Sequence, residues 1–529
     1  MRKLVALGLV LALAGCDSST TPDPAQPLGP PKPGTLRILA GSELADMKPI
    51  LDQAAQATGV TATFTFSGTL EGAEQLARGD AAGKFDAVWF SSNRYLQSLP
   101  EANKRLGNQV KIMNSPVLLG LSSTAVRRLG WENKRVSWSE IAEAAGNKAF
   151  TYGMTDPSAS NSGFSALVGV ASALAGTGSA VTPDQIASVS PALTKFFAGQ
   201  ALSAGSSGWL SEAYQRRATG ADAGQKVDGL INYESVLLSM NADGKLPEPL
   251  SLVYPSDGVV SADYPLTLLS DANNDARDAH QRLSDYLRTP DVQRKIMDTT
   301  RRRPAIPGIG DFSPKDLVEL PFPAGNDAID ALLSAYFNKI RRPSRTLYVL
   351  DVSGSMQGER IESLRSALIA LTGADGSLIG KYRGFRGREE VTLLPFASTP
   401  GAPETFTVPE SAPQAELDRI KATASNLKAS GGTAIYDSLL RGYQLLGQPS
   451  PDRFTSIVLM TDGENQNGSP LGAFEAAQPR LAKIPVFTVL FGEGSPDEMN
   501  RVAALTGGQV FDARNTPLAK VFQEVRGYQ

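Results

Sequence analysis

Three polar segments in the last third of the chain carry oxygen-bearing side chains that could share one cation. Asp351, Ser353 and Ser355 alternate in the segment DVSGS, Thr433 follows two glycines, and Asp462 stands in the segment TDG. Two carboxylates and three hydroxyls are hard oxygen donors, with no thiolate or imidazole among them. Such a set suits Mg²⁺, or else Mn²⁺ or Ca²⁺, rather than zinc. It also leaves room for an acidic group from a partner to complete the coordination of the ion.

The elements that must bring these segments together alternate between strands and helices. Uniformly apolar runs are typical of strands covered on both faces, and they occur at residues 346–350, 457–460 and 486–491. Helical patterns fill residues 360–371, 414–427, 434–446 and 498–505. This alternation predicts a doubly wound α/β domain, in which ligands bind at the carboxyl ends of the strands. Asp351 and Asp462 both follow such an end.

The five residues resemble the metal-ion-dependent adhesion site of von Willebrand factor type A (VWA) domains. The family pattern is Asp-x-Ser-x-Ser, then a distant Thr and a distant Asp, and this chain matches it position for position over a domain of residues 345–529. The resemblance implies a Rossmann-like fold with the cation at its top. It also implies a protein partner that offers an acidic residue to the ion. A serine-rich turn before a helix is the alternative interpretation of DVSGSM alone.

The small numbers of cysteine and histidine residues restrict the remaining chemistry. The chain has one cysteine, Cys16, and one histidine, His280, so no disulfide can form within the chain. Histidine-based zinc sites and Ser-His-Asp or Cys-His catalysis therefore lack most of their components. His280 lies in a polar helical stretch and is predicted to be a surface residue. Because neither Ser353 nor Ser355 has a histidine base nearby in sequence, we expect that the protein is not an enzyme.

The overall charge gives no reason to expect a nucleic-acid partner. The chain has 51 Lys and Arg residues against 54 Asp and Glu residues, a formal net charge of -3. Proteins that bind nucleic acids usually show a basic excess or stripe. The short arginine runs at 301–303 and 341–342 are predicted to be solvated ends of elements.

The first sixteen residues are typical of an export signal. Arg2 and Lys3 precede an apolar run at 4–14, which is too short to span a bilayer, and the segment LAGC ends at Cys16. This arrangement resembles the bacterial lipobox. The resemblance implies a signal peptide at residues 1–15 and a lipid anchor on Cys16 that holds the protein on the membrane. An ordinary secretory signal with a stray cysteine is the alternative.

The rest of the chain is expected to lie in the cell envelope, outside the cytoplasm. No second apolar run is long enough to cross a membrane. Residues 16–34 are rich in Pro, Ser, Thr and Gly and are predicted to form a disordered tether. Asp17 resembles an inner-membrane retention signal, but the sequence leaves the choice between inner and outer membrane open.

Hydroxyl-bearing residues stand at the ends of several predicted strands and helices within residues 35–310. Ser42, Ser67 and Ser91 each follow a predicted strand, Ser162 opens an apolar helix, and Tyr233 lies at a strand-to-helix junction. Free N–H groups at helix starts favour anions. These five residues are our candidates for a cleft that binds a small polar solute or an oxyanion. The alternative is that the hydroxyls only cap helices.

This region resembles the two-lobed periplasmic solute-binding proteins used by ABC importers. The resemblance rests on DAVWFSSN, SPVLLGLSS, TDPSASNSGFSAL, INYESV, YPSDGVVSADYP and TPDVQRKIMDTTRRRPAIPG. It implies two α/β lobes with the ligand between them, one made of residues 35–115 and 256–310 and the other of residues 116–255. Residues 311–344 are predicted to be a linker with an amphipathic helix at 326–342.

Three functions are compatible with this sequence. The first is a membrane-anchored binding protein whose VWA domain makes metal-dependent contacts with another protein and is coupled to a solute-binding domain. The second is a receptor of an ABC-type importer with an accessory VWA domain. The third, a metal-dependent hydrolase, lacks a catalytic signature. The intact set of five oxygen donors favours the first, since a transport receptor needs no such site.

Overall fold

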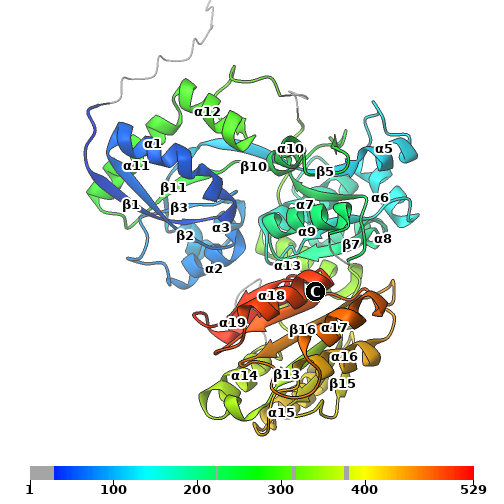
Figure 1. Ribbon diagram of the computed structural model, residues 1–529. Coiled ribbons are helices and arrows are strands. Elements are labelled where there is room, and N and C mark those ends of the chain that lie inside the picture. Colours follow the sequence, from blue (N-terminus) through cyan, green and yellow to red (C-terminus); the bar gives the residue numbers. More distant parts are fainter. Residues whose placement is uncertain (1–28, 222–223, 313–316, 324, 374–379) are drawn as a thin grey trace, which may run out of the picture.

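The computed structural model describes residues 29–221, 224–312, 317–323, 325–373 and 380–529. They form two α/β lobes and a C-terminal α/β domain, shown in Figure 1. The predicted fold class is confirmed. The signal peptide, Cys16 and most of the tether lie outside the described residues.

Lobe 1 is a five-stranded sheet in which β1, β2 and β3 are parallel and β11 is antiparallel to its neighbours. The strands lie in the order β2 (Val60–Phe66), β1 (Gly34–Ala40), β3 (Ala87–Trp89), β11 (Pro265–Leu269) and β4 (Leu106–Lys111). Its helices are α1 (Lys48–Thr58), α2 (Thr69–Arg78), α3 (Arg94–Ser98), α4 (Pro100–Asn103), α11 (Asn274–Leu287) and α12 (Pro290–Thr300), with a 3₁₀ turn at Ser42–Met47.

Lobe 2 is a mixed sheet built around the long strand β5. Its main path is β10 (Ser261–Ala262), β5 (Met113–Ser122), β8 (Gly229–Tyr233), β6 (Tyr152–Thr155) and β7 (Gln200–Ala204), and β9 (Leu250–Val253) and β12 (Arg303–Pro304) also pair with β5. Its helices are α5 (Ser123–Leu129), α6 (Trp138–Gly146), α7 (Asn161–Ala175), α8 (Pro183–Ala198), α9 (Ser207–Thr219) and α10 (Glu234–Ala242).

The chain crosses between the lobes at slightly different points from those expected. The first crossing falls between Lys111 and Met113, a few residues before residue 116. The return to lobe 1 follows Ala262 rather than residue 255, because β10 still pairs with β5. Strand pairing therefore extends lobe 2 by a few residues beyond each end of the predicted range.

The C-terminal domain is a six-stranded sheet in which β15 alone, at one edge, is antiparallel to its neighbour. The strands lie in the order β15 (Glu404–Thr407), β14 (Glu390–Phe396), β13 (Ser344–Asp351), β16 (Phe454–Thr461), β17 (Val486–Leu490) and β18 (Val510–Asp512). The helices are α14 (Glu359–Ala370), α15 (Gln414–Ser425), α16 (Ile435–Leu446), α17 (Leu471–Ala477), α18 (Pro496–Thr506) and α19 (Leu518–Arg526).

The continuous apolar run of β13 follows from burial on both faces. Leu347 and Val349 lie in a hydrophobic cluster with Leu439 of α16. Tyr348 and Leu350, which alternate with them, lie in a separate cluster that also contains side chains of α14 and α19. Successive side chains of a strand point to opposite faces, so a strand covered on both faces needs apolar residues at every position.

A helical linker joins lobe 2 to the C-terminal domain. Helix α13 (Asn326–Ala335) continues into a π-helical turn at Tyr336–Ile340, and it packs against α8 of lobe 2. The Phe337 ring stacks on Tyr382 of the C-terminal domain, with the ring centroids 5.1 Å apart. None of the helices in the described ranges is long and apolar enough to cross a membrane.

Two predictions about exposure, for His280 and for the arginine runs, were wrong in whole or in part, and burial explains both. His280 is buried, and its Nε2 lies 3.1 Å from the carbonyl oxygen of Leu266, because its helix packs against the sheet of lobe 1. In the arginine run at 301–303 only Arg301 is exposed. Arg302 is buried and pairs with Asp46 at 2.7 Å, and Arg303 pairs with the buried Glu234 at 2.6 Å.

The second arginine run is likewise enclosed rather than solvated. Arg341 is buried, with a guanidinium nitrogen 3.7 Å from a carboxylate oxygen of Asp156 in lobe 2. The guanidinium of Arg342 lies over the ring of Phe454, 4.5 Å from its centroid. Both residues therefore belong to the junction between the linker, lobe 2 and the C-terminal domain.

Candidate functional site

The first candidate site lies where β13 and β16 end. The two strands are parallel, with Leu350 opposite Met460, so Asp351 at the end of β13 comes beside Thr461 at the end of β16. The hydroxyl of Thr461 donates a hydrogen bond to Asp351 Oδ2 at 2.7 Å. Asp462 follows directly. The register of the two strands thus brings two carboxylates that are 111 positions apart in the numbering to one edge of the sheet.

The side-chain oxygens of Ser353, Ser355 and Asp462 form one hydrogen-bonded chain, and Asp351 joins it through the backbone of Ser353. After β13 the backbone turns so that the amide of Ser353 donates to Asp351 Oδ1 at 2.8 Å. The hydroxyls of Ser353 and Ser355 lie 2.9 Å apart, and Ser355 Oγ donates to Asp462 Oδ1 at 2.8 Å. Asp351, Ser353 and Asp462 are each at most 1% exposed.

The fifth predicted residue, Thr433, is buried in a loop fixed against the same turn. Gly431 provides its carbonyl to the amide of Gly354 at 2.8 Å. The Thr433 amide donates to Asn467 Oδ1 at 3.1 Å, and its carbonyl accepts from the amides of Gln466 and Asn467 at 2.9 and 3.0 Å. The segment that follows Asp462 therefore positions the Thr433 loop.

Two glycines make that loop possible. Gly431 has φ +82°, a left-handed conformation that is costly for residues with a Cβ. A Cβ added to Gly432 would lie 1.8 Å from Asn467 Oδ1, which is far inside van der Waals contact. The amide of Gly432 also donates to the hydroxyl of Ser398, at 2.8 Å.

The two carboxylates of this site have different electrostatic surroundings. Burial raises the pKa of the Asp351 carboxyl, and hydrogen bonds from Ser353 and Thr461 oppose this shift only in part. Arg360, which the sequence analysis did not single out, donates to Asp462 Oδ2 at 2.6 Å. A charge of the opposite sign stabilises an ionised carboxylate in such a place. Arg360 thus places a positive charge beside Asp462, whereas Asp351 is held by the uncharged donors Ser353 and Thr461.

The donor set fits a hard divalent cation. Its members are carboxylate and hydroxyl oxygens, the ligands that Mg²⁺, Mn²⁺ and Ca²⁺ prefer. Among the described residues, no group of three or more His, Cys, Asp or Glu side chains could hold a metal ion. A cation at this site would therefore depend on the serine and threonine hydroxyls as well as on the two carboxylates.

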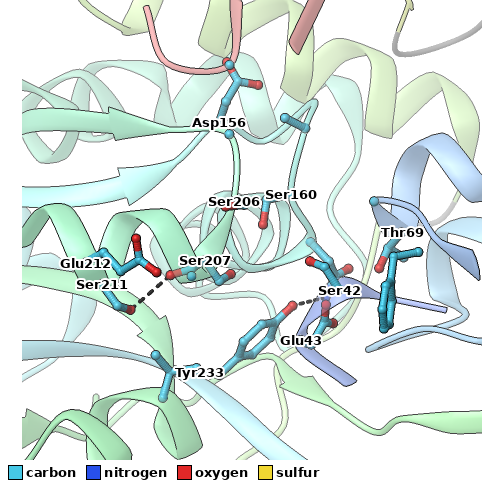
Figure 2. A pocket seen from close by; sticks show the side chains of 18 of the residues that line it. Ser42, Glu43, Thr69, Asp156, Ser160, Ser206, Ser207, Ser211, Glu212 and Tyr233 are labelled. Atoms are coloured by element: carbon cyan, nitrogen blue, oxygen red, sulfur yellow. Dashed lines mark hydrogen bonds between the residues drawn. The ribbon is translucent and has the colours of Figure 1, made fainter. Parts of the chain in front are cut away.

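The second candidate site is a cavity of about 1010 Å³ between the two lobes. Ser42, Ser67 and Tyr233 line it, as Figure 2 shows for Ser42 and Tyr233. Ser91 and Ser162 are fully buried and lie immediately behind its wall. Other lining residues, which the sequence analysis did not select, include Glu43, Thr69, Asp156, Ser160, Ser206, Ser207, Ser211 and Glu212.

The buried hydroxyls connect the lining groups of the two lobes. Ser91 Oγ lies 3.2 Å from Thr69 Oγ1 and accepts a hydrogen bond from the Tyr233 hydroxyl at 3.1 Å. Burial raises the pKa of the Tyr233 phenol well above its ordinary value, so Tyr233 is neutral at physiological pH. On lobe 2, Ser162 Oγ lies 2.7 Å from Ser207 Oγ. These contacts fix the positions of the hydroxyls that face the cavity.

Helix capping does not account for most of these side chains. Helices α2 and α7 begin at the cavity, and neither has a side-chain hydrogen bond at its N-cap residue, Gly68 or Ser160. Ser206 does cap α9, through the amide of Trp209. Ser42 and Ser67 are not N-cap residues. Most of the hydroxyl groups that line the cavity therefore do not cap helices.

The guanidinium groups that line the cavity are paired with carboxylates. Arg302 pairs with Asp46 at 2.7 Å, and Arg526 pairs with Glu389 at 2.6 Å. Burial raises the pKa of the Glu43 carboxyl, which also faces the cavity. Hydroxyl and amide groups therefore share the surface of the cavity with carboxylates such as those of Asp156, Glu212 and Glu524.

The C-terminal domain supplies a third wall of this cavity. Arg383, Gln509, Phe511 and Tyr528 line it together with residues from both lobes. No sequence signal pointed to these residues, because they are scattered over loops, a strand and the end of the chain. Their position depends on how the domains pack.

Comparisons with protein families agree with this architecture. Residues 36–299 match the family model of the bacterial extracellular solute-binding proteins, and residues 345–511 match the model of the von Willebrand factor type A domain. The chain therefore contains a solute-binding-protein domain, made of lobes 1 and 2, and a VWA domain.

Curated relatives match over part of the chain. The inter-alpha-trypsin inhibitor heavy chain H4 of Sus scrofa is 34% identical over 128 residues, which is 23% of this chain and 12% of that protein. A protein of Synechocystis sp. is 31% identical over 179 residues, or 32% of this chain and 37% of that protein. The chain thus spans well under half the length of either relative.

Solved structures are similar at low sequence identity. The sulfate-binding protein SubI from Mycobacterium tuberculosis is 17% identical, with a TM-score of 0.42, over 56% of this chain and 98% of that one. A periplasmic binding protein, AfuA from Actinobacillus pleuropneumoniae, is 13% identical, with a TM-score of 0.44, over 58% and 99%. A von Willebrand factor type A protein from Catenulispora acidiphila is 18% identical, with a TM-score of 0.29, over 35% and 42%.

The Thr433 loop yields a prediction about stability. Gly432→Ala places a methyl group against the side chain of Asn467, and we expect a loss of about 1–3 kcal/mol in the stability of the VWA domain, the usual cost of overpacking. Asn467→Ala removes the obstructing amide, so the double variant should lose less than the sum of the two single losses. Urea unfolding of all three variants measures this coupling, and strictly additive losses would contradict the proposed clash.

Proposed function

We propose that the protein is a membrane-anchored, extracytoplasmic binding protein whose VWA domain uses a divalent cation, most favourably Mg²⁺, to hold an acidic residue of a protein partner. Asp351, Ser353, Ser355, Thr433 and Asp462 would hold the ion. The observation that carries the proposal is a cluster in which the Ser353 amide binds Asp351 and the side-chain oxygens of Ser353, Ser355 and Asp462 form one hydrogen-bonded chain. The bound ion would supply a positive centre with positions left for ligands from outside the chain.

Arg360 supports an acidic partner in particular. Its guanidinium neutralises part of the charge of Asp462, and its side chain is 34% exposed. The two carboxylates and Arg360 together carry a formal charge of -1, so a divalent ion bound there would keep a net positive charge. A carboxylate from a partner would restore neutrality and could contact the ion and the guanidinium together.

The solute-binding domain would serve a second binding role in the same chain. Its cavity offers many hydroxyl groups, and helices α2, α7 and α9 begin at its wall. These groups favour a small polar solute or an oxyanion held by hydroxyls and backbone N–H groups rather than by unpaired cations. Ser42, Ser67 and Tyr233 would contact the solute, with Ser91 and Ser162 positioned behind them.

A receptor for an ABC-type importer is the second candidate function. The family match over residues 36–299 and the cavity between the lobes favour it. In that function the VWA domain would be an accessory, and solute uptake would continue without the cation. The two functions therefore differ in whether binding to the partner depends on the metal site.

The first prediction from the proposed function concerns the metal site itself. We expect that Asp351→Ala abolishes Mg²⁺ binding, because it removes one of the two carboxylates of the cluster. Calorimetric titration with MgCl₂ measures the effect, and circular dichroism checks that the variant is folded. Asp512→Ala is the matched control, since Asp512 ends another strand of the same sheet and pairs with Arg514. Equal Mg²⁺ binding by wild type and Asp351→Ala would exclude this site.

Arg360 yields a second prediction. Its positive charge opposes a cation at the carboxylate it contacts, so Arg360→Gln should raise the affinity for Mg²⁺, by about tenfold once solvent screening is allowed for. The same titration measures this, with the exposed Arg441→Gln on α16 as the control. A weaker affinity in Arg360→Gln would show instead that Arg360 is needed to position Asp462.

The lipid anchor is proposed from the segment that ends at Cys16, and it leads to a third prediction. Cys16→Ser removes the only thiol of the chain, so acylation is lost and the protein should leave the membrane fraction. Fractionation of cells that express either form, with the protein followed by immunoblotting, tests this. If the variant stayed with the membranes through a salt wash, the anchor would have to be something other than a lipid on Cys16.

A further inference from the structure

Lobe 2 and the VWA domain share one hydrophobic core. The Trp209 ring of α9 meets the Tyr528 ring edge to face, with centroids 4.9 Å apart, and also approaches Phe487 of β17. A Cβ added to Gly205 would lie 2.5 Å from the Tyr528 ring. A single cluster of buried side chains contains residues of both domains. Apolar packing of this kind fixes the VWA domain on lobe 2.

Lobe 1 meets the VWA domain in a different way. Glu71, in the first turn of α2, pairs with Lys520 of α19 at 3.0 Å and lies 3.9 Å from a guanidinium nitrogen of Arg383. In the described part of the chain, the ion pairs between lobe 1 and the VWA domain all involve this one carboxylate. Beside them, an open groove of about 610 Å³ separates α2 from α19. The contact is therefore polar and loosely packed.

Arg383 lies where the three bodies meet. One of its nitrogens donates to the carbonyl oxygen of Ser158 in lobe 2 at 3.3 Å, and another faces Glu71 of lobe 1. Its side chain also lines the cavity between the lobes. Figure 1 shows α19 on the side of the VWA domain that is turned toward the lobes. A residue of the VWA domain thus contacts both lobes, which also touch each other directly through Tyr233 with Ser91 and Tyr95 with Phe164.

We propose that the solute site is a three-domain site, in which the VWA domain is fixed to lobe 2 and sets the width of the cleft through the ion pairs of Glu71 with Lys520 and Arg383. The proposal rests on the solute-binding function proposed above and adds its regulation. A solute that draws lobe 1 toward lobe 2 must rearrange the Glu71 pairs, and a shift of the VWA domain must change the cleft. The pairs thus couple the solute site to the VWA domain.

The position of lobe 1 relative to the VWA domain, on which the width of the cleft depends in this proposal, can be measured without any solute or metal ion. Spin labels on Gln56→Cys in lobe 1 and Lys421→Cys in the VWA domain, in the full chain carrying Cys16→Ser, report the distance between these bodies by pulsed electron paramagnetic resonance. A second pair, Glu132→Cys with Lys421→Cys, reports the distance between lobe 2 and the VWA domain. All three labelled positions are exposed.

We expect that Glu71→Gln broadens the distance distribution between lobe 1 and the VWA domain at least twofold. The distance distribution between lobe 2 and the VWA domain should remain unchanged. In the protein with Glu71 intact, 1 M NaCl should produce the same broadening, because the ion pairs are partly exposed and are screened by salt. Asp52→Asn, whose ion pair with Lys48 lies within lobe 1, should behave like the parent protein.

A charge reversal provides a second test. Glu71→Lys combined with Lys520→Glu and Arg383→Glu should restore the narrow distribution that Glu71→Lys alone loses. The proposal is overturned if Glu71→Gln leaves the lobe 1 distances unchanged, if both label pairs broaden equally, or if the reversed charges fail to restore the distribution. Because no ligand is added, these results do not depend on whether the cavity binds a solute.

Discussion

The parallel register of β13 with β16 is the constraint on which the metal site depends. It aligns the carboxyl ends of two neighbouring strands, so that Asp351 and Thr461 are side by side and Asp462 follows within reach of Ser355. The central residues of both strands, 347–350 and 457–460, are apolar because helices cover both faces of the sheet. Burial thus fixes the register, and the register brings the two carboxylates and their hydroxyl partners together.

Strand register does not determine the geometry of the cavity between the lobes. That site has walls from two separate sheets and from the VWA domain, and its geometry depends on how these bodies are held relative to one another. One junction is apolar and close packed, around Trp209 and Tyr528. The other is an ion-pair contact beside an open groove. This asymmetry gives the molecule one rigid junction and one that can respond to charge, salt or a bound solute.

The sequence was sufficient to predict the fold class and most elements of the C-terminal domain, because long apolar runs and helical periodicity are local signals. It did not predict the strands β14, β15 and β18 or the helices α17 and α19. Arg302 and His280 were assigned to the surface because their neighbours are polar, but packing buries both. Asn467 and Arg360 were missed because their roles appear only when distant loops meet. The third wall of the cavity had no sequence signal, since it depends on domain packing.

The most direct test of the account is a crystal of the protein soaked in MnCl₂, with anomalous diffraction used to locate the ion. The account predicts one Mn²⁺ peak at the carboxyl ends of β13 and β16, within coordination distance, about 2.0–2.4 Å, of oxygens from Ser353 and Ser355. A peak only at other surface carboxylates, or no peak at saturating Mn²⁺, would contradict it.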